Sequence, residues 1–347
     1  MAGENGADIA ETSRSEEGSG VRRAGIKRRR ELIPWVVFLI VFGLMPVVYS
    51  ASFQHNVAVL ICITALMATG WNLLGGFTGQ ISLGHALFFG IGAYTTAIGG
   101  IRYDLNPWLG LLMGALLAVA ISAVIGLPVF RLRGHYFSIA TIAVGEIAVL
   151  VFLNWQFVGA ARGLSIPIKD DSLLELQFSG QQKWEYYYIA AVMLLLALLA
   201  TAWILRSRIG YYLVAIREDQ EAAASVGIPV ARYKQIALSF SALLVGVAGG
   251  FFAQYLLFVD PDSMFGLTVS IQITIAAVLG GVRNMWGPVI GATVLLSVTE
   301  SARLYLGGTG EALNLVAYGL LVMVIAAFEP NGLIGLGGRL RNLRRAR

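Results

Sequence analysis

The sequence contains few charged residues and almost no cysteine. Only 13% of its 347 residues are Asp, Glu, Lys or Arg, whereas a soluble domain carries roughly 25%. The single cysteine, Cys62, excludes a disulfide framework within the chain and a thiolate metal centre. His55, His85 and His135 are too far apart for a local metal motif. These shortages argue against a soluble domain and a disulfide scaffold, and we expect neither a metal nor a cofactor.

Lysine is also scarce, which bears on nucleotide binding. The phosphate-binding loop of many ATPases needs Lys directly after Gly and before Ser or Thr. The lysines of this chain are Lys27, Lys169, Lys183 and Lys234, and none of them follows Gly. The chain therefore lacks this ATP-binding loop. No nucleophile motif or catalytic pair is visible either, so we predict a protein without catalytic residues of its own.

What the sequence has instead is long apolar runs. Hydrophobic residues make up 57% of the chain and occur in runs of about 20, the length of a helix that crosses a bilayer core of about 30 Å. The runs do not alternate apolar with polar residues, which argues against a membrane β-barrel. The sequence predicts an all-α polytopic membrane protein. We expect about ten transmembrane helices, near residues 32–50, 55–74, 81–101, 107–130, 135–153, 186–205, 235–258, 267–282, 285–303 and 312–328.

Basic residues at the ends of these runs predict the orientation of the chain. Positive charge is retained on the cytoplasmic side of a membrane, and both ends of the chain are rich in Arg. We therefore expect both termini in the cytoplasm, and we read the net charge of +5 as a membrane signal and not as a nucleic-acid site. The expected organisation is a disordered basic tail over 1–31, a transmembrane domain over 32–330 with a cytoplasmic loop at 206–234, and a basic tail over 331–347.

The loop 206–234 is a polar segment between long apolar runs. It contains Glu221, Ala222 and Ala223, followed by Gly227. The alanines favour a helix and leave little side-chain bulk, while Gly and a nearby Pro end it. We interpret the segment as a short cytoplasmic helix that docks into a cleft of another protein. The alternative is a solvated loop with a chance Glu-Ala-Ala triplet.

A glycine-rich break near residues 75–80 precedes the polar side chains of Gln80, Ser82 and His85. Irregular backbone at membrane depth is tolerated only where it lines a cavity or is buried in protein. These three side chains are therefore candidates for contact with a solute. A tight turn that packs small residues between helices is the alternative.

Glu146 lies in the middle of its predicted span. A carboxylate at that depth is costly unless it is paired or hydrated, and it marks a candidate site. We expect it either to meet a positively charged group of a solute or to pair with a polar neighbour such as His85 or Asn72.

Two other patterns concern packing and the external side. The glycines at 246 and 250, and those at 287 and 291, have the spacing of faces where membrane helices pack closely. The long loop 154–185 is predicted to be external. It is either a segment on which a partner docks or a plain connector.

Several segments together resemble one family of membrane transport proteins. Residues 215–228 (AIREDQEAAASVGI) are similar to the EAA loop of ABC-importer permeases, and closest to the branched-chain amino acid permeases, LivM type. Residues 79–94 and 133–146 resemble other typical segments of that family. Shorter motifs near 241, 279 and 328 follow in the same order, so the resemblance extends over about residues 55–335.

This resemblance implies a permease subunit that forms a solute pathway together with a second, related permease subunit in a heterodimer. It also implies two cytoplasmic ABC ATPases, an external solute-binding protein and a place in the lipid bilayer of a bacterial plasma (inner) membrane. Glu221, Ala222, Ala223 and Gly227 would couple the permease to the ATPases. The solute would be a branched-chain or related amino acid, with urea, an aromatic acid or another small solute as alternatives. A self-sufficient secondary transporter is the alternative from another class.

Overall fold

The computed structural model describes residues 34–43, 45, 52–132, 134–178, 184–305, 319 and 332–335. The chain divides into two compact units, Met1–Ala51 and Ser52–Arg347, and each is described by itself. In the first unit an apolar helix extends over Pro34–Gly43, inside the predicted span 32–50. The predicted tail over 1–31 lies outside the described residues, as does most of the tail over 331–347.

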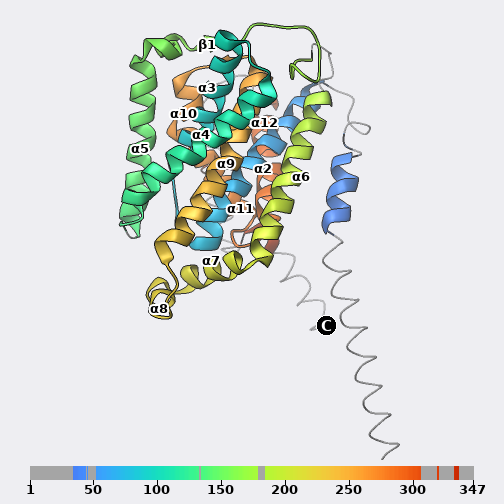
Figure 1. Ribbon diagram of the computed structural model, residues 1–347. Coiled ribbons are helices and arrows are strands. Elements are labelled where there is room, and N and C mark those ends of the chain that lie inside the picture. The colour runs from blue at the N-terminus through green and yellow to red at the C-terminus, as the bar shows by residue number, and fades with distance from the viewer. Residues whose placement is uncertain are drawn as a thin grey trace, which may run out of the picture. The chain divides into compact units, whose positions relative to one another are not determined.

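The second unit is a bundle of helices with one very short sheet (Figure 1). Strands β1 (Leu164–Ser165) and β2 (Phe258–Val259) pair antiparallel, with Leu164 opposite Val259. The all-helical class predicted from the sequence is confirmed. The described helices are α2 (Ser52–Thr78), α3 (Ala86–Tyr103), α4 (Pro107–Val129), α5 (His135–Asn154), η1 (Gln156–Val158), η2 (Ala160–Arg162), α6 (Trp184–Arg206), α7 (Arg208–Glu218), α8 (Gln220–Ser225), α9 (Val230–Leu256), α10 (Pro261–Phe265), α11 (Leu267–Gly280) and α12 (Gly287–Tyr305).

Helices α2 and α9 form the centre of this bundle. Helix α9 packs against α2, α3 and α4, and α2 packs in addition against α6, α11 and α12. Trp71 on α2 and Phe251 on α9 are among the largest side chains that are fully buried. Most of the apolar part of each helix is buried by its neighbours, so neither helix has the wide polar face of a helix at the surface of a soluble protein.

Glycines let the helices of the bundle approach one another closely, as their spacing predicted. A Cβ atom at Gly246 of α9 would press on Ala118 of α4 at 3.0 Å, and one at Gly250 would meet Thr96 of α3 at 2.5 Å. A Cβ atom at Gly291 of α12 would overlap a backbone carbonyl of α11. Both predicted glycine pairs therefore lie at helix contacts, where small residues allow close packing.

Six of the described helices are long and apolar enough to cross a membrane: Phe53–Thr78, Pro107–Val129, His135–Asn154, Trp184–Arg206, Val230–Leu256 and Pro261–Gly280. Four of the ten predicted spans are not among them. Spans 32–50 and 312–328 lie partly or almost wholly outside the described residues. The predicted span 81–101 begins later, as α3, because residues 79–85 are irregular. The span 285–303 is α12, whose sequence includes Thr, Ser and Glu residues.

The bundle has two different ends, with α7 and α8 at one and β1 at the other (Figure 1). At the β1 end, Lys169 Nζ donates to Asp104 Oδ1 at 2.6 Å. This hydrogen bond lowers the pKa of the Asp104 carboxyl and raises the pKa of Lys169. Trp108 Nε1 donates to the carbonyl oxygen of Leu173 at 2.9 Å. The described part of the loop 154–185 is therefore fastened to the chain's own helices.

Candidate functional site

Helices α7 and α8 connect α6 to α9, and we call these two helices, residues 208–225, the elbow. Helix α7 begins after Ser207, whose hydroxyl accepts the backbone N–H of Ile209 at 3.2 Å. Helix α8 begins after Asp219, whose Oδ1 accepts the backbone N–H groups of Glu221 at 2.8 Å and Ala222 at 3.0 Å. Such caps satisfy donors that have no partner within the helix. The six residues of α8 therefore form a separate helix, as the Glu-Ala-Ala sequence predicted.

The residues predicted to couple this chain to a motor do not all face outward. Glu221 and Ala222 are exposed, and so is Gly227 just after the helix. Gly227 has a φ of +88°, and no other atom lies within 4 Å of the position of a Cβ there. Ala223, by contrast, is only 4% exposed and packs against the chain itself. The outward surface of α8 and of the turn after it therefore includes three of the four predicted residues.

Two hydrogen bonds fasten the elbow to the bundle. Lys234 on α9, which is 1% exposed, donates from Nζ to Gln220 Oε1 at 2.7 Å. Arg217 on α7 donates from Nη1 to the carbonyl oxygen of Gly76 near the end of α2, at a long 3.5 Å. A Cβ atom at Gly79 would lie 3.2 Å from Cγ of Arg217. Helix α8 is therefore joined directly to α9, and α7 is joined to the end of α2.

The irregular segment that follows α2 covers residues 79–85. It begins later than the break predicted at 75–80, because residues 75–78 belong to α2. Other helices hold this segment, which we call the break, through hydrogen bonds. Trp71 Nε1 of α2 donates to the carbonyl oxygen of Ser82 at 2.7 Å. Helix α5 contributes two contacts: Ser138 Oγ donates to the Ile81 carbonyl at 2.6 Å, and Thr141 Oγ1 accepts the backbone N–H of Leu83 at 3.0 Å. The irregular backbone is thus satisfied by protein, as membrane depth requires.

His85 ends this segment and is fully buried. Its Nδ1 lies 3.0 Å from Ser82 Oγ, and its Nε2 lies 2.8 Å from Ser241 Oγ on α9. Both ring nitrogens are therefore engaged within the chain. Gln80 is half-buried at the edge of the segment. Of the three candidates in the break, Ser82 and His85 form one hydrogen-bonded group and Gln80 lies apart from it.

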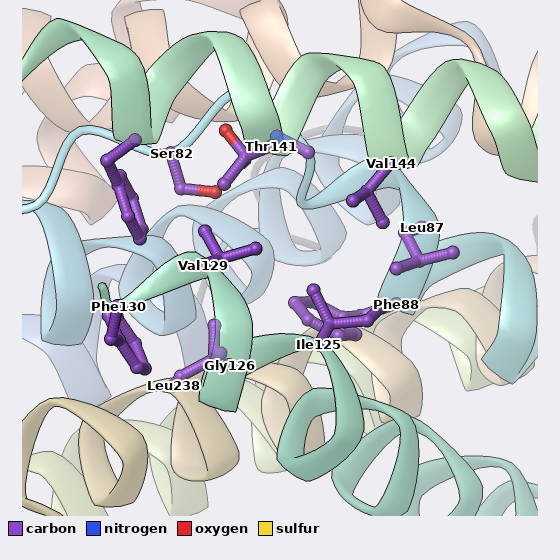
Figure 2. A pocket seen from close by; sticks show the side chains of 12 residues that line it. Ser82, Leu87, Phe88, Ile125, Gly126, Val129, Phe130, Thr141, Val144 and Leu238 are labelled. Atoms are coloured by element: carbon purple, nitrogen blue, oxygen red, sulfur yellow. Dashed lines mark hydrogen bonds between the residues drawn. The ribbon is translucent and has the colours of Figure 1, made fainter. Parts of the chain in front are cut away.

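A small pocket lies beside the break, between α3, α4, α5 and α9. Figure 2 shows the Ser82 and Thr141 side chains next to each other, with apolar side chains such as Phe88, Val129 and Leu238 around the remaining wall. The pocket leaves room of about 20 Å³ for a water-sized group. That is enough for about one water molecule, so the pocket in this arrangement is too small for an amino acid.

Comparison with known proteins decides the class of this membrane protein. The model of the family described as branched-chain amino acid transport system / permease component matches residues 54–325. The chain belongs to this family. The permease LivM of Escherichia coli (strain K12) is 31% identical over 301 residues, which cover 80% of this chain and 69% of LivM. LivH of the same strain is 26% identical over 285 residues, which cover 78% of this chain and 91% of LivH.

A more distant relative and a solved structure also match the chain. A probable LivM of Methanocaldococcus jannaschii is 21% identical over 272 residues, which cover 72% of this chain and 78% of that protein. Among solved structures, PsaBC from Streptococcus pneumoniae in complex with Fab matches with a TM-score of 0.41 and 14% identity, covering 84% of this chain and 93% of that one. As a member of the permease family, the chain is a multi-pass transport subunit and not the ATPase, as predicted.

Glu146 does not lie where it could pair with His85 or Asn72, which was one of its two predicted roles. His85 is bonded to Ser82 and Ser241, and Asn72 Nδ2 donates to the carbonyl oxygen of Asn284 at 3.0 Å. Glu146 is exposed on the outer surface of α5. The pairing of Glu146 with His85 or Asn72 is therefore wrong for this permease.

Several residues of this site carry no local sequence signal. Ser241 lies 156 residues from His85, and Ser270 Oγ accepts the backbone N–H of Ala86 at 2.8 Å across 184 residues. Each is one of several hydroxyl residues in a largely apolar run, since Ser239 lies near Ser241 and Thr268 and Thr274 lie near Ser270. Only the fold brings Ser241 and Ser270 to the break.

The His85 contacts lead to a stability prediction for the permease. His85→Leu removes two hydrogen bonds and leaves the buried hydroxyl groups of Ser82 and Ser241 short of a partner. We expect a loss of about 1–3 kcal/mol for each unsatisfied group and therefore a lower melting temperature of the detergent-purified permease. The matched control is His135→Leu, because His135 is exposed at the start of α5. Equal melting temperatures of the two variants would contradict a structural role of His85.

Proposed function

We propose that this chain is one of two permease subunits of an importer for branched-chain or related amino acids. Two cytoplasmic ABC ATPases drive transport, and an external binding protein delivers the solute. The chain crosses a bacterial inner membrane about ten times, with both termini and α8 in the cytoplasm. Family membership supports this proposal. Relatives of both kinds, LivM and LivH, are named as permease proteins of a high-affinity branched-chain amino acid transport system.

The observation that carries the proposal is the geometry of α8. A helix of six residues presents Glu221 and Ala222 at one end of the bundle, and the turn after it presents Gly227. The Lys234–Gln220 hydrogen bond fixes it to α9. Such a helix has little side-chain bulk, so its backbone can enter a cleft of another protein, and its attachment to α9 lets it move as a rigid body with the bundle. These are the properties that a contact point for a separate motor needs.

The solute pathway is proposed to pass between this chain and the second permease. Gln80, Ser82, His85 and Glu146 are its candidate residues. Gln80 and Glu146 reach the surface of the chain, whereas the buried Ser82 and His85 shape the break. The pocket beside Ser82 leaves only about 20 Å³, whereas small-molecule sites enclose about 300 Å³ or more. This difference supports a pathway beside the described helices and not through this pocket.

The direct test is reconstitution of the complete transporter in proteoliposomes with its binding protein. We expect leucine, isoleucine or valine, together with the binding protein, to stimulate ATP hydrolysis and drive uptake. Stimulation by urea or by an aromatic acid alone would reject the solute class but keep the importer. Solute uptake by this chain without any ATPase would reject the importer and favour a secondary transporter.

Glu221→Lys tests the docking role of α8 within that assay. The charge at position 221, in the exposed first turn of α8, would change from negative to positive, which also opposes the dipole of the helix. A wrong charge at an interface costs several kcal/mol, so uptake should fall at least about tenfold, with the permease still inserted. Ser225→Ala is the matched control, because it changes an exposed side chain of the same helix without altering its charge. If the Glu221→Lys variant takes up solute at the wild-type rate, Glu221 does not lie at the interface with the ATPase.

A further inference from the structure

The outer surfaces of three spanning helices differ in polarity. On α4, every exposed residue from Leu109 to Leu127 is apolar. On α6, the exposed residues from Val192 to Trp203 are also all apolar. Such surfaces match the hydrocarbon of a bilayer. Helix α5 differs from both because its exposed surface includes the carboxylate of Glu146.

Glu146 is far from both ends of its helix. Helix α5 extends over His135–Asn154, so a rise of 1.5 Å per residue places Glu146 about 12 Å from one end and about 16 Å from the other. A side chain at this depth cannot easily reach the polar headgroups. Placing a charged residue against lipid near the middle of a helix costs at least about 2.5 kcal/mol. Lipid is therefore a poor neighbour for this surface.

The surroundings of Glu146 fit a second protein. Ile139, Ala143, Ile147 and Leu150 are exposed at helical spacing with it and form one face, which we call the α5 face. Ala143 lies one turn before Glu146 and is small enough to let another helix approach. Glu146 makes no hydrogen bond or ion pair with any residue that the structure describes.

Other polar residues near α5 support the same conclusion. Helix α11 contacts α5, and on α11 Thr268 is exposed while Gln272 is half-buried. Figure 1 shows α5 at one edge of the second unit and α6 at a different edge. The polar surfaces of α5 and α11 are thus separate from the apolar surface of α6.

We infer that the α5 face is covered by the second permease subunit, and that the Glu146 carboxylate accepts a hydrogen bond from that subunit. This inference rests on the proposed function, which requires two permeases. The chain resembles both LivM and LivH of one organism, so a transport system of this kind has two related permease chains. A membrane-embedded partner is the occupant that supplies both an apolar surface for Ile147 and a donor for Glu146.

Site-specific photo-crosslinking tests the inference in the assembled transporter. The photoreactive amino acid p-benzoylphenylalanine replaces Ile147 on the α5 face, and Val124 on α4 or Leu196 on α6 as matched exposed controls. From position 147 we expect an adduct whose mass is the sum of the two different permease subunits. From positions 124 and 196 we expect no such adduct. Partner adducts from α4 or α6, with only lipid or intrachain adducts from α5, would overturn the inference and leave the importer standing.

The same experiment separates failure of the inference from failure of the proposed function. An adduct of two copies of this chain would replace the second permease by a homodimer. Absence of any second permease from the purified wild-type transporter would overturn both.

Substitution of Glu146 gives an independent measurement. Glu146→Leu removes the polar group, while Glu146→Gln keeps an acceptor oxygen of nearly the same shape. At an interface, the Leu variant should lose most of the co-purified second permease and the Gln variant should retain it. If the α5 face contacts lipid instead, the Leu variant would retain the second permease fully and melt at a higher temperature than the wild type. That result would overturn the inference.

Discussion

Gly92→Ala is expected to lower the melting temperature of the permease strongly, whereas Gly100→Ala on the same helix is expected to raise it slightly. A Cβ atom at Gly92 would overlap the backbone carbonyl of Gly246 on α9. Gly114 of α4 also lies close, because its own Cβ would be 3.0 Å from the carbonyl oxygen of Gly92. Three helices therefore meet at Gly92 through their backbones, and none of these atoms is the flexible end of a side chain.

The size of the effect follows from this rigidity. Forcing extra atoms into a packed core costs typically 1–3 kcal/mol and occasionally more, and here about 3 kcal/mol or more is expected because helices must separate. A Cβ at Gly100 meets nothing within 4 Å, so alanine there should stabilise the helix by about 0.5–1 kcal/mol. Melting of the two detergent-purified variants, followed by gel filtration after heating, measures the difference. Equal melting temperatures would show that α3 and α9 are not packed through Gly92.

The sequence predicted features that depend on local pattern. Hydrophobic runs located most of the helices, and the glycines at 246 and 250 predicted a packing face that the structure contains. The partner of that face was not predictable. Gly92 lies in a run with several other glycines, and the sequence does not show which of them contacts α9. The position of a close contact depends on which helices pack against each other, and the local sequence around a glycine does not reveal this.

In the candidate site, too, the sequence did not show which side of a helix faces the bundle. The sequence placed Glu146 in the middle of a span and Ala223 in a short helix, and both placements are correct. It did not show that Glu146 points out of the bundle or that Ala223 points into it. An amphipathic helix reveals its buried side by its pattern, but α5 is apolar on nearly every side. A helix as short as α8 has too few residues for a pattern. Packing against neighbours decides both orientations.

Gly227→Trp is expected to reduce uptake by the complete transporter at least about a hundredfold, while ATP hydrolysis by the complex continues. A φ of +88° makes this position unfavourable for any residue with a Cβ, and the structure has open space around it. The indole therefore projects outward from the end of α8, where the ATPase is proposed to dock. An obstruction that costs about 3 kcal/mol in the coupled state corresponds to about a hundredfold.

Gly227→Ala separates the backbone from the obstruction, because alanine shares the unfavourable φ but adds only a methyl group. The left-handed conformation costs a residue other than glycine roughly 1–2 kcal/mol, so the alanine variant should lose part of its uptake and remain well above the tryptophan variant. Uptake and ATP hydrolysis are measured in the same proteoliposomes. Equal losses in both variants would assign the effect to the turn that ends α8, where Gly227 donates its backbone N–H to Ala224. Wild-type uptake in both would place the docking surface elsewhere, since a bulky ring at the tip of the proposed contact cannot be accommodated without moving one protein away from the other.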